Sequence, residues 1–357
     1  QPGPNDAIPF FGTLTSNVDG IDSPGLVISS LGNSSIKPER TAEVELGFDA
    51  SMISNRVNLE FTYYKKTSKD ALILRTLAPS AGTASSRLEN IGKTQNEGVE
   101  ASINSTILDS KKFGWEMTLS GSYNKGKIVS LGGNPPSKGT TNSDIEGYPI
   151  QGWWLRPYTY QDKNGNGIIE YYSPTSANAA LNEVLVGDTN VYVGPPLPPG
   201  EFTAYNVFEL FGRKLRIQAL VDAKVGGYQL NGNERIRCQS RSNCRGDMDP
   251  TAPLDEQARA VVVRQTPSAS QYGYVEKTDF IRFRELSFTY SFPDRWAHWF
   301  AASRISATLS GRNLGVITGY SGLDPESGYF GTNIGVVSDF QTAPPATYYT
   351  FRLNVSF

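Results

Sequence analysis

The sequence predicts an all-β protein, an antiparallel transmembrane β-barrel portion of about nine strands with long loops at one end. Three observations predict this class. Apolar and polar residues alternate in many segments, short and long connections follow one another in turn, and no apolar run reaches the roughly 18 residues that a membrane helix needs. A barrel strand needs apolar residues only at every second position, so it leaves no such run.

The first predicted strand, residues 41–52, shows the alternation most clearly. Apolar side chains occupy every second position from Ala42 to Met52, and mostly polar ones occupy the positions between them. Period 2 places the two kinds on opposite faces of a strand. Similar patterns predict eight further strands, at residues 57–70, 98–108, 113–125, 201–210, 215–226, 276–292, 304–316 and 347–357.

Two of these strands are less regular. Residues 201–210 carry only a weak apolar face. In residues 276–292 the alternation changes phase, because Ile281 and Phe283 share one parity whereas Leu286 and Phe288 share the other. One extra residue near Arg284–Glu285 restores a single apolar face, so we expect a β-bulge there.

The polar faces of the strands carry charged side chains. A charge in contact with lipid is costly, so in a barrel these residues point into the lumen or against a plug. They are Glu43, Glu45, Asp49, Glu60, Glu116, Asp222, Lys224 and Arg352. A soluble sheet with this face in solvent is the alternative that the strand pattern alone leaves open.

The connections distinguish these alternatives. Met52, Leu108 and Leu210 are each followed by a tight turn, and a modest link follows Phe292. The other connections are long and alternate with the short ones, which is typical of outer-membrane barrels with their long extracellular loops. The expected long loops are residues 71–97, 126–199, 227–274 and 317–346, and residues 1–40 form an extracellular loop that enters the barrel. The extended stretch 150–160 is placed in an extracellular excursion, since a further membrane strand would break the alternation.

The composition excludes several classes of function. The chain of 357 residues has 33 Lys and Arg against 35 Asp and Glu, a net charge of −2, whereas a nucleic-acid-binding domain is usually basic. One histidine and two cysteines exclude a His-pair metal site and a four-thiolate zinc or iron–sulfur site. His298 lies among aromatic residues in the 293–304 link, where we expect it at a membrane interface rather than in catalysis.

A set of motifs resembles one known family. These are Ser35-Ile36-Lys37-Pro38-Glu39-Arg40-Thr41, Asn96-Glu97-Gly98-Val99-Glu100, Asp279-Phe280-Ile281-Arg282-Phe283-Arg284-Glu285-Leu286, Ser310-Gly311-Arg312-Asn313-Leu314, Tyr320-Ser321-Gly322-Leu323-Asp324-Pro325-Glu326 and the terminal Phe357. In this order they resemble the C-terminal barrel region of SusC/RagA-like TonB-dependent (TonB-linked) outer-membrane transporters. Each motif is weak alone, but the set covers the chain from about residue 31 onward.

The resemblance implies a larger machine. Family members close a 22-stranded barrel around an N-terminal plug, and neither the plug nor a TonB-contacting segment is visible in this chain. The implied partners are the rest of the barrel and plug, TonB, a SusD-like surface lipoprotein and the lipid bilayer of the bacterial outer membrane. The implied activity is import of a glycan or peptide nutrient without enzyme chemistry. A non-transporting surface β-protein, such as an adhesin or assembly component, is the alternative; a secreted carbohydrate-active enzyme would need a carboxylate pair that we do not identify.

One long loop carries a motif that suits calcium. Oxygen ligands at alternate positions, with glycine for a tight turn, are what a calcium loop needs. The candidate ligands are Asp162, Asn164, Asn166, the Ile168 carbonyl and Glu170. The EF-hand pattern asks for Glu eleven residues after the first ligand, where this chain has Ser173. A metal-free loop held by Asn, Asp and Gly is the alternative.

Two further features of the long loops are candidate sites. Cys238 and Cys244 are close in sequence, and the oxidising cell exterior favours a disulfide over two free thiols. Aromatic side chains in the 150–160 stretch suit stacking on a sugar or peptide ligand, although packing within the loop is the commoner explanation for such residues. These candidate ligand-binding residues are Trp153, Trp154, Tyr158 and Tyr160.

Overall fold

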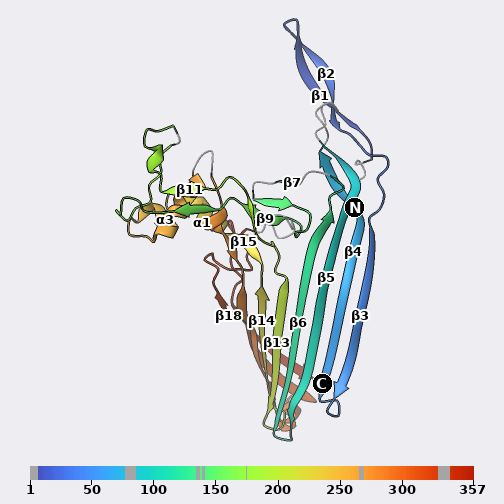
Figure 1. Ribbon diagram of the computed structural model, residues 1–357. Helices are drawn as coiled ribbons and strands as arrows, with labels where there is room; N and C mark the ends of the chain where they lie inside the picture. The colour runs from blue at the N-terminus through green and yellow to red at the C-terminus, as the bar shows by residue number, and fades with distance from the viewer. Residues whose placement is uncertain are drawn as a thin grey trace.

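A computed structural model of the protein describes residues 7–76, 86–133, 137–138, 141–173, 175–264, 269–328 and 338–357. Its main feature is one antiparallel sheet of nine strands, in the order β19-β18-β17-β14-β13-β6-β5-β4-β3 (Figure 1). The strands are β3 (Arg40–Met52), β4 (Val57–Thr76), β5 (Ser86–Asp109), β6 (Phe113–Ser130), β13 (Gly200–Leu210), β14 (Leu215–Val225), β17 (Phe280–Ser291), β18 (Arg304–Thr318) and β19 (Tyr348–Ser356). The prediction of an all-β, nine-stranded fold is confirmed.

The connections divide the sheet into two ends. Tight turns join β3 to β4, β5 to β6 and β13 to β14 at one end, and a link with the helix α4 (Asp294–His298) joins β17 to β18 there. The long connections gather at the opposite end (Figure 1). We call these the short-turn end and the loop end.

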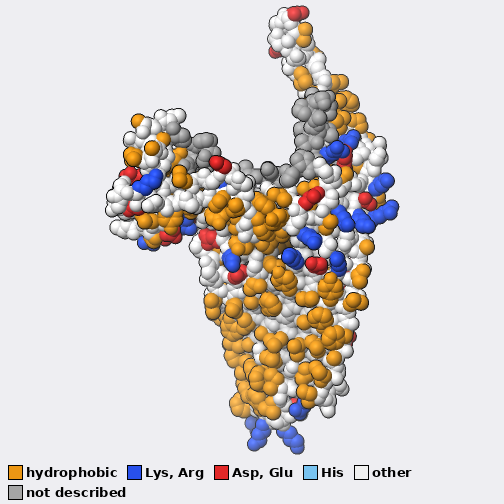
Figure 2. Space-filling view, viewed as in Figure 1, with side chains coloured by type: hydrophobic (Ala, Val, Ile, Leu, Met, Phe, Trp, Pro, Cys, Tyr) orange, Lys and Arg blue, Asp and Glu red, His pale blue; other side chains and the backbone are white. Residues whose placement is uncertain are grey.

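The two faces of the sheet differ in polarity, as the alternation predicts. On β3, Val44, Leu46 and Phe48 are 61%, 66% and 54% exposed on one face. Figure 2 shows hydrophobic side chains covering the lower part of this face. The described residues contain no helix that is long and apolar enough to cross a membrane.

The phase change in the seventh sheet strand is a β-bulge. Phe283 pairs with Val221 and Glu285 with Leu220, so Arg284 is the extra residue on β17. The pairing of β17 with β18 shifts at the same place. The predicted bulge is confirmed, and it lets Ile281 and Phe288 occupy one apolar face despite their different parity.

The prediction that residues 71–97 form a loop is wrong over most of that range. β4 continues to Thr76 and β5 begins at Ser86, with Leu72 paired to Asn90 and Arg75 to Arg87. Only residues 77–85 separate the two strands. The error has a physical cause: residues 71–74 are apolar at consecutive positions and residues 93–97 are all polar, so the alternation that marks a half-buried strand is missing from both stretches.

The expected loop at residues 1–40 also contains strands. β1 (Phe10–Val18) and β2 (Ile21–Ser30) form a separate two-stranded hairpin that projects from the loop end (Figure 1). The expected loop 126–199 also starts five residues too early, because β6 runs to Ser130. Likewise, β18 runs to Thr318 in the expected loop 317–346, of which residues 329–337 lie outside the described part of the chain.

The other long connections fold into small layers beside the sheet. The 150–160 stretch forms β9 and β10, which lie outside the nine-stranded sheet as predicted. These connections contain β7 (Ser137–Lys138), β8 (Asn142–Asp144), β9 (Gly152–Leu155), β10 (Tyr158–Tyr160), η2 (Ala179–Leu181), β11 (Val184–Val186), β12 (Val191–Gly194), β15 (Tyr228–Leu230), α1 (Gly232–Gln239), α2 (Arg245–Met248), α3 (Leu254–Arg264), η3 (Tyr272–Tyr274) and β16 (Val275–Lys277). Their shared core includes Trp153, Leu155, Val263 and Tyr274.

Candidate functional site

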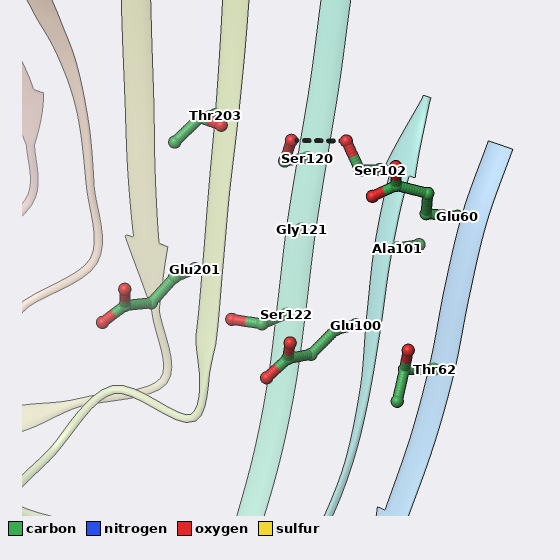
Figure 3. A pocket seen from close by; sticks show the side chains of 10 residues that line it. All are labelled: Glu60, Thr62, Glu100, Ala101, Ser102, Ser120, Gly121, Ser122, Glu201 and Thr203. Carbon is green, nitrogen blue, oxygen red and sulfur yellow. Dashed lines mark hydrogen bonds between the residues drawn. The ribbon is translucent and has the colours of Figure 1, made fainter. Parts of the chain in front are cut away.

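The polar face of the sheet carries a shallow hollow of about 320 Å³. Four neighbouring strands, β4, β5, β6 and β13, supply its lining (Figure 3). The lining residues are Glu60, Thr62, Glu100, Ala101, Ser102, Ser120, Gly121, Ser122, Glu201 and Thr203. Small side chains dominate, which leaves the backbone accessible, and the Ser102 and Ser120 hydroxyls lie 3.1 Å apart.

Carboxylates give this hollow its charge. Glu60, Glu100 and Glu201 are exposed, and only Glu201 has a cation within ion-pair distance among the described residues, with Lys224 Nζ at 3.2 Å. Carboxylate and hydroxyl groups offer many hydrogen-bond acceptors. The arrangement therefore suits contact with amide and hydroxyl donors of another polypeptide segment or of a polar solute.

The bulge residue Arg284 builds a second polar cluster on this face. Its guanidinium donates to both carboxylate oxygens of Asp222, with Nε 2.8 Å from Oδ1. It also lies 3.0 Å from Glu326 Oε1 and 3.3 Å from Asn313 Oδ1. The extra residue of the bulge thus places this side chain where two strands and the segment after β18 meet.

Arg282 holds the same segment more deeply. Its Nη2 donates to both carboxylate oxygens of Asp324 at 2.7 Å, and its Nε lies 2.8 Å from Glu326 Oε2. The side chains of Arg282 and Asp324 are 3% and 5% exposed. Because Arg282 pairs in register with Asp222, the segment Ser321–Gly328 lies against the polar face of the sheet. We call Arg282, Arg284, Asp222, Asp324 and Glu326 the arginine clamp.

The clamped segment also reaches the layers at the loop end. Ser321 Oγ donates to Glu276 Oε1 at 2.7 Å, and Asn231 Nδ2 donates to Ser321 Oγ at 2.9 Å. Nearby, Asp339 accepts hydrogen bonds from the Gly232 and Asn233 amides at the start of α1. No role for Arg282, Arg284 or Asp324 in holding this segment was predicted from the sequence. The available signal was two arginines flanking the phase change, with an Asp-Pro-Glu motif later in the chain.

The four predicted ligand-stacking residues occupy different environments. Trp153 is fully buried, and its indole N–H donates to the Tyr228 carbonyl at 2.9 Å, so it packs the loop core, which is the alternative to ligand stacking. Trp154 instead packs with Tyr148 and Tyr192, at ring-centroid distances of 4.7 and 5.4 Å. A fully enclosed side chain cannot stack on an incoming ligand, whereas a partly exposed cluster can.

The remaining two candidates differ in exposure. Tyr158 is half-buried against Tyr272, and burial raises the pKa of its hydroxyl to about 12. Tyr160 is 42% exposed. Burial likewise raises the pKa of Tyr192 to about 12. Of the four residues, Tyr160 is therefore the one most available to a ligand.

The loop at residues 162–170 is tightly turned by its own side chains. Asp162 accepts hydrogen bonds from the Gly165 and Gly167 amides at 2.7 and 2.8 Å, where both glycines have positive φ. Asn164 and Asn166 accept from amides two residues further on. Each of these oxygens keeps a second lone pair, so the donor set fits a hard cation such as calcium.

Glu170 closes the same loop. Its carboxylate accepts from the Asn164 and Asn166 side-chain amides and, at 2.9 Å, from the Tyr172 hydroxyl. Glu183 supports the loop from outside through the Lys163 and Glu170 amides. The five predicted ligands therefore belong to one compact turn.

Cys238 and Cys244 form a disulfide in the structure, and both are buried. Cys238 lies in α1 and Cys244 immediately precedes α2, so the bond joins the two helices next to α3. The bond therefore restrains α1 and α2, and Asn231 at the start of α1 contacts Ser321 of the clamped segment.

His298 is exposed at the end of α4, at the short-turn end. Its neighbours Trp299 and Phe300 are 78% and 66% exposed, and Trp296 stacks on Phe292. This aromatic surface continues the apolar face of the sheet, as the interface prediction requires.

Comparisons with known proteins agree with this architecture. A family model described as "TonB dependent receptor-like, beta-barrel" matches residues 2–240. TonB-dependent receptor P3 of Formosa agariphila is 26% identical over 99% of this chain and 38% of its own length. TonB-dependent receptor SusC of Bacteroides thetaiotaomicron is 23% identical over 91% of this chain and 32% of its own length.

A solved structure shares the fold. The RagAB peptide importer in its open-open state superposes with a TM-score of 0.74 at 21% identity, covering 100% of this chain and 38% of the matched one. The chain thus spans less than two fifths of the length of these relatives. Members of the matched family are outer-membrane transporters and not enzymes. The chain therefore belongs to the TonB-dependent receptor family, as a SusC/RagA-like part of its outer-membrane β-barrel.

Proposed function

We propose that the chain forms the C-terminal barrel strands of a TonB-dependent importer that takes up a peptide or glycan. The observation that carries the proposal is the two-faced sheet: its apolar face suits lipid, and its polar face, with the glutamate-lined hollow, suits a lumen. The shared fold with the RagAB peptide importer supports it. The acceptor-rich hollow suits a plug or a hydrogen-bonding solute.

Further strands complete this barrel in the proposal. β3 and β19 are the edges of the sheet, and each has a single partner strand among the described residues. An unpaired strand edge in lipid costs several kcal/mol for each unsatisfied backbone group. We infer that both edges pair with the remaining barrel strands of the same protein, which also supplies a plug and the segment that contacts TonB.

A surface lipoprotein of the SusD type is the proposed partner at the loop end. Long loops of outer-membrane barrels face the cell exterior, so the loop end is the side that such a lid covers. The RagAB importer, whose fold this chain shares, supports a two-component assembly. The layers that contain β8 to β12 and α1 to α3 would then contact both ligand and lid.

Growth of the source bacterium on single nutrients tests this function. A strain without the full-length gene should lose growth on one class of peptide or glycan, and the restored gene should recover it. Deleting TonB should abolish the same growth. Unchanged growth on every tested nutrient, together with lost surface attachment, would instead support a non-transporting adhesin.

The polar hollow provides a more local test. Replacing Glu60, Glu100 and Glu201 together by Gln should change the rate of uptake, because three lumen charges are removed. Glu45→Gln, Glu116→Gln and Asp49→Asn, on the same face outside the hollow, form a matched triple control. Equal uptake rates in the two triple variants would show that the hollow has no special part in transport.

A further inference from the structure

Six cations gather on the apolar face of the sheet, where β3 to β6 extend toward the loop end. They are Arg40, Lys65, Lys69, Lys93, Lys125 and Lys127, which we call the outer cation cluster. Figure 2 shows this basic surface above the hydrophobic band. Lys65 and Lys125 each follow an apolar-face tyrosine, Tyr63 or Tyr123, by two residues, so they share its face.

Strand pairing sets like charges directly opposite one another. Arg40 pairs with Lys69, and Lys69 pairs in turn with Lys93, so three cations form a row across β3, β4 and β5. Opposed like charges on one face of a sheet are destabilising. Such a row therefore favours the binding of an anion.

The protein supplies little neutralising charge here. Glu97, between Lys65 and Lys125 in the paired rows, is the carboxylate that shares their face. Among the described residues, no member of the outer cation cluster forms an ion pair. On the opposite face, by contrast, Lys66 lies 3.7 Å from Glu43.

The cluster lies at the edge of the lipid-facing surface. The next residues on the apolar face below Lys65 and Lys125 are Tyr63 and Tyr123. The exposed Leu46 pairs with Tyr63, and the exposed Phe48 lies one row further down. Tyrosines concentrate where a membrane meets water, and cations beside that level attract anionic head groups. The tight turns at the other end place this edge in the outer leaflet.

We propose that the outer cation cluster binds the phosphate groups of an outer-leaflet glycolipid of the lipid A type, whose acyl chains lie along the apolar band. The lysine ammonium groups contact phosphate oxygens, and the strand ends that extend past the band bring them to head-group height. This site is separate from the lumen and from the proposed substrate. It requires only the outer-membrane position of the barrel.

Native mass spectrometry of the full-length transporter in detergent tests the proposal with diphosphoryl lipid A as the probe. Lys65, Lys69 and Lys125 are replaced together by Gln. Each cation near an anionic surface contributes roughly fivefold to the affinity, so the triple variant should bind the lipid about a hundredfold more weakly. The matched control replaces Lys111, Lys112 and Lys214 by Gln at the short-turn end, removes the same charge, and should bind as the parent does.

Two further measurements make the result decisive. Monophosphoryl lipid A should bind the parent more weakly, and added salt should reduce binding in the parent more than in the triple variant. Equal binding by the parent and the triple variant would overturn the proposal. So would a triple variant that keeps lipid binding but loses its surface lipoprotein, because the cluster would then be a protein interface. Uptake assayed on the same variants separates either failure from a failure of transport.

Discussion

Arg282 of β17 and Asp324 of the segment after β18 form a buried ion pair, with Nη2 2.7 Å from both carboxylate oxygens. The two residues are 42 positions apart in sequence. A charge buried without its partner is costly, so this pair fixes the segment to the wall of the sheet. The relationship supports a first prediction about stability.

Asp324→Asn should lower the free energy of unfolding by about 3 kcal/mol, because it leaves the Arg282 charge buried with Glu326 as its remaining partner. Urea unfolding of the full-length protein in vesicles measures this. Asp109→Asn is the control, since the Arg213–Asp109 pair is 60% and 53% exposed and should contribute less than about 1 kcal/mol. An equal loss of unfolding free energy in the two variants would mean that the buried Arg282–Asp324 pair contributes no more than an exposed ion pair.

The disulfide predicts a specific pair of linked tryptic peptides. Trypsin cleaves after Arg237, Arg241 and Arg245, which puts Cys238 and Cys244 on separate four-residue peptides. Without reductant these peptides should appear as one linked species, and reduction should separate them. Free peptides from a protein digested under non-reducing, alkylating conditions would show that the thiols are unpaired.

We expect the turn at residues 162–170 to bind calcium weakly, with a dissociation constant of about 0.1–1 mM, because two of its ligands are neutral Asn side chains. Terbium luminescence sensitised by Tyr172, whose hydroxyl donates to Glu170, can detect the bound ion, and calcium should displace it. Asp162→Asn should abolish the signal, whereas Asp188→Asn in the same long connection should preserve it. No signal at millimolar concentrations would indicate a metal-free turn.

Tyr158 should stay protonated to unusually high pH, because burial raises its pKa from 10.0 to about 12. A pKa that is higher in the folded state stabilises the fold below pH 10, and this contribution is lost as pH rises from 10 to 12. The difference between tyrosinate absorbance titrations of the parent and Tyr158→Phe isolates this hydroxyl. A midpoint near pH 10 would contradict its burial.

The aromatic candidates separate into packing and binding roles. Trp153→Ala should destabilise the loop layers by about 3–5 kcal/mol, because it empties a fully buried position. Tyr160→Ala should leave protease resistance of the loops unchanged and weaken substrate binding severalfold, measured by calorimetry on the full-length complex. An unchanged substrate affinity in Tyr160→Ala would show that Tyr160 is exposed but does not contact the substrate.

The sequence was most informative where one strand face meets an apolar environment. Alternation located all nine sheet strands, and the phase change predicted the bulge that the structure places at Arg284. Alternation did not locate the ends of β4 and β5. Residues 71–74 of β4 are apolar on both faces and residues 93–97 of β5 are polar on both faces, so neither stretch shows the alternation.

Sequence alone determined the strand faces, the bulge, the excursion at residues 150–160 and the family resemblance, because each rests on local spacing or on an ordered set of motifs. Only the tertiary structure decided that Trp153 is core, that Arg282 holds Asp324, and that Arg40, Lys69 and Lys93 form one row. Each of these depends on residues distant in sequence. Register and loop folding bring such residues together, and no local pattern encodes that proximity.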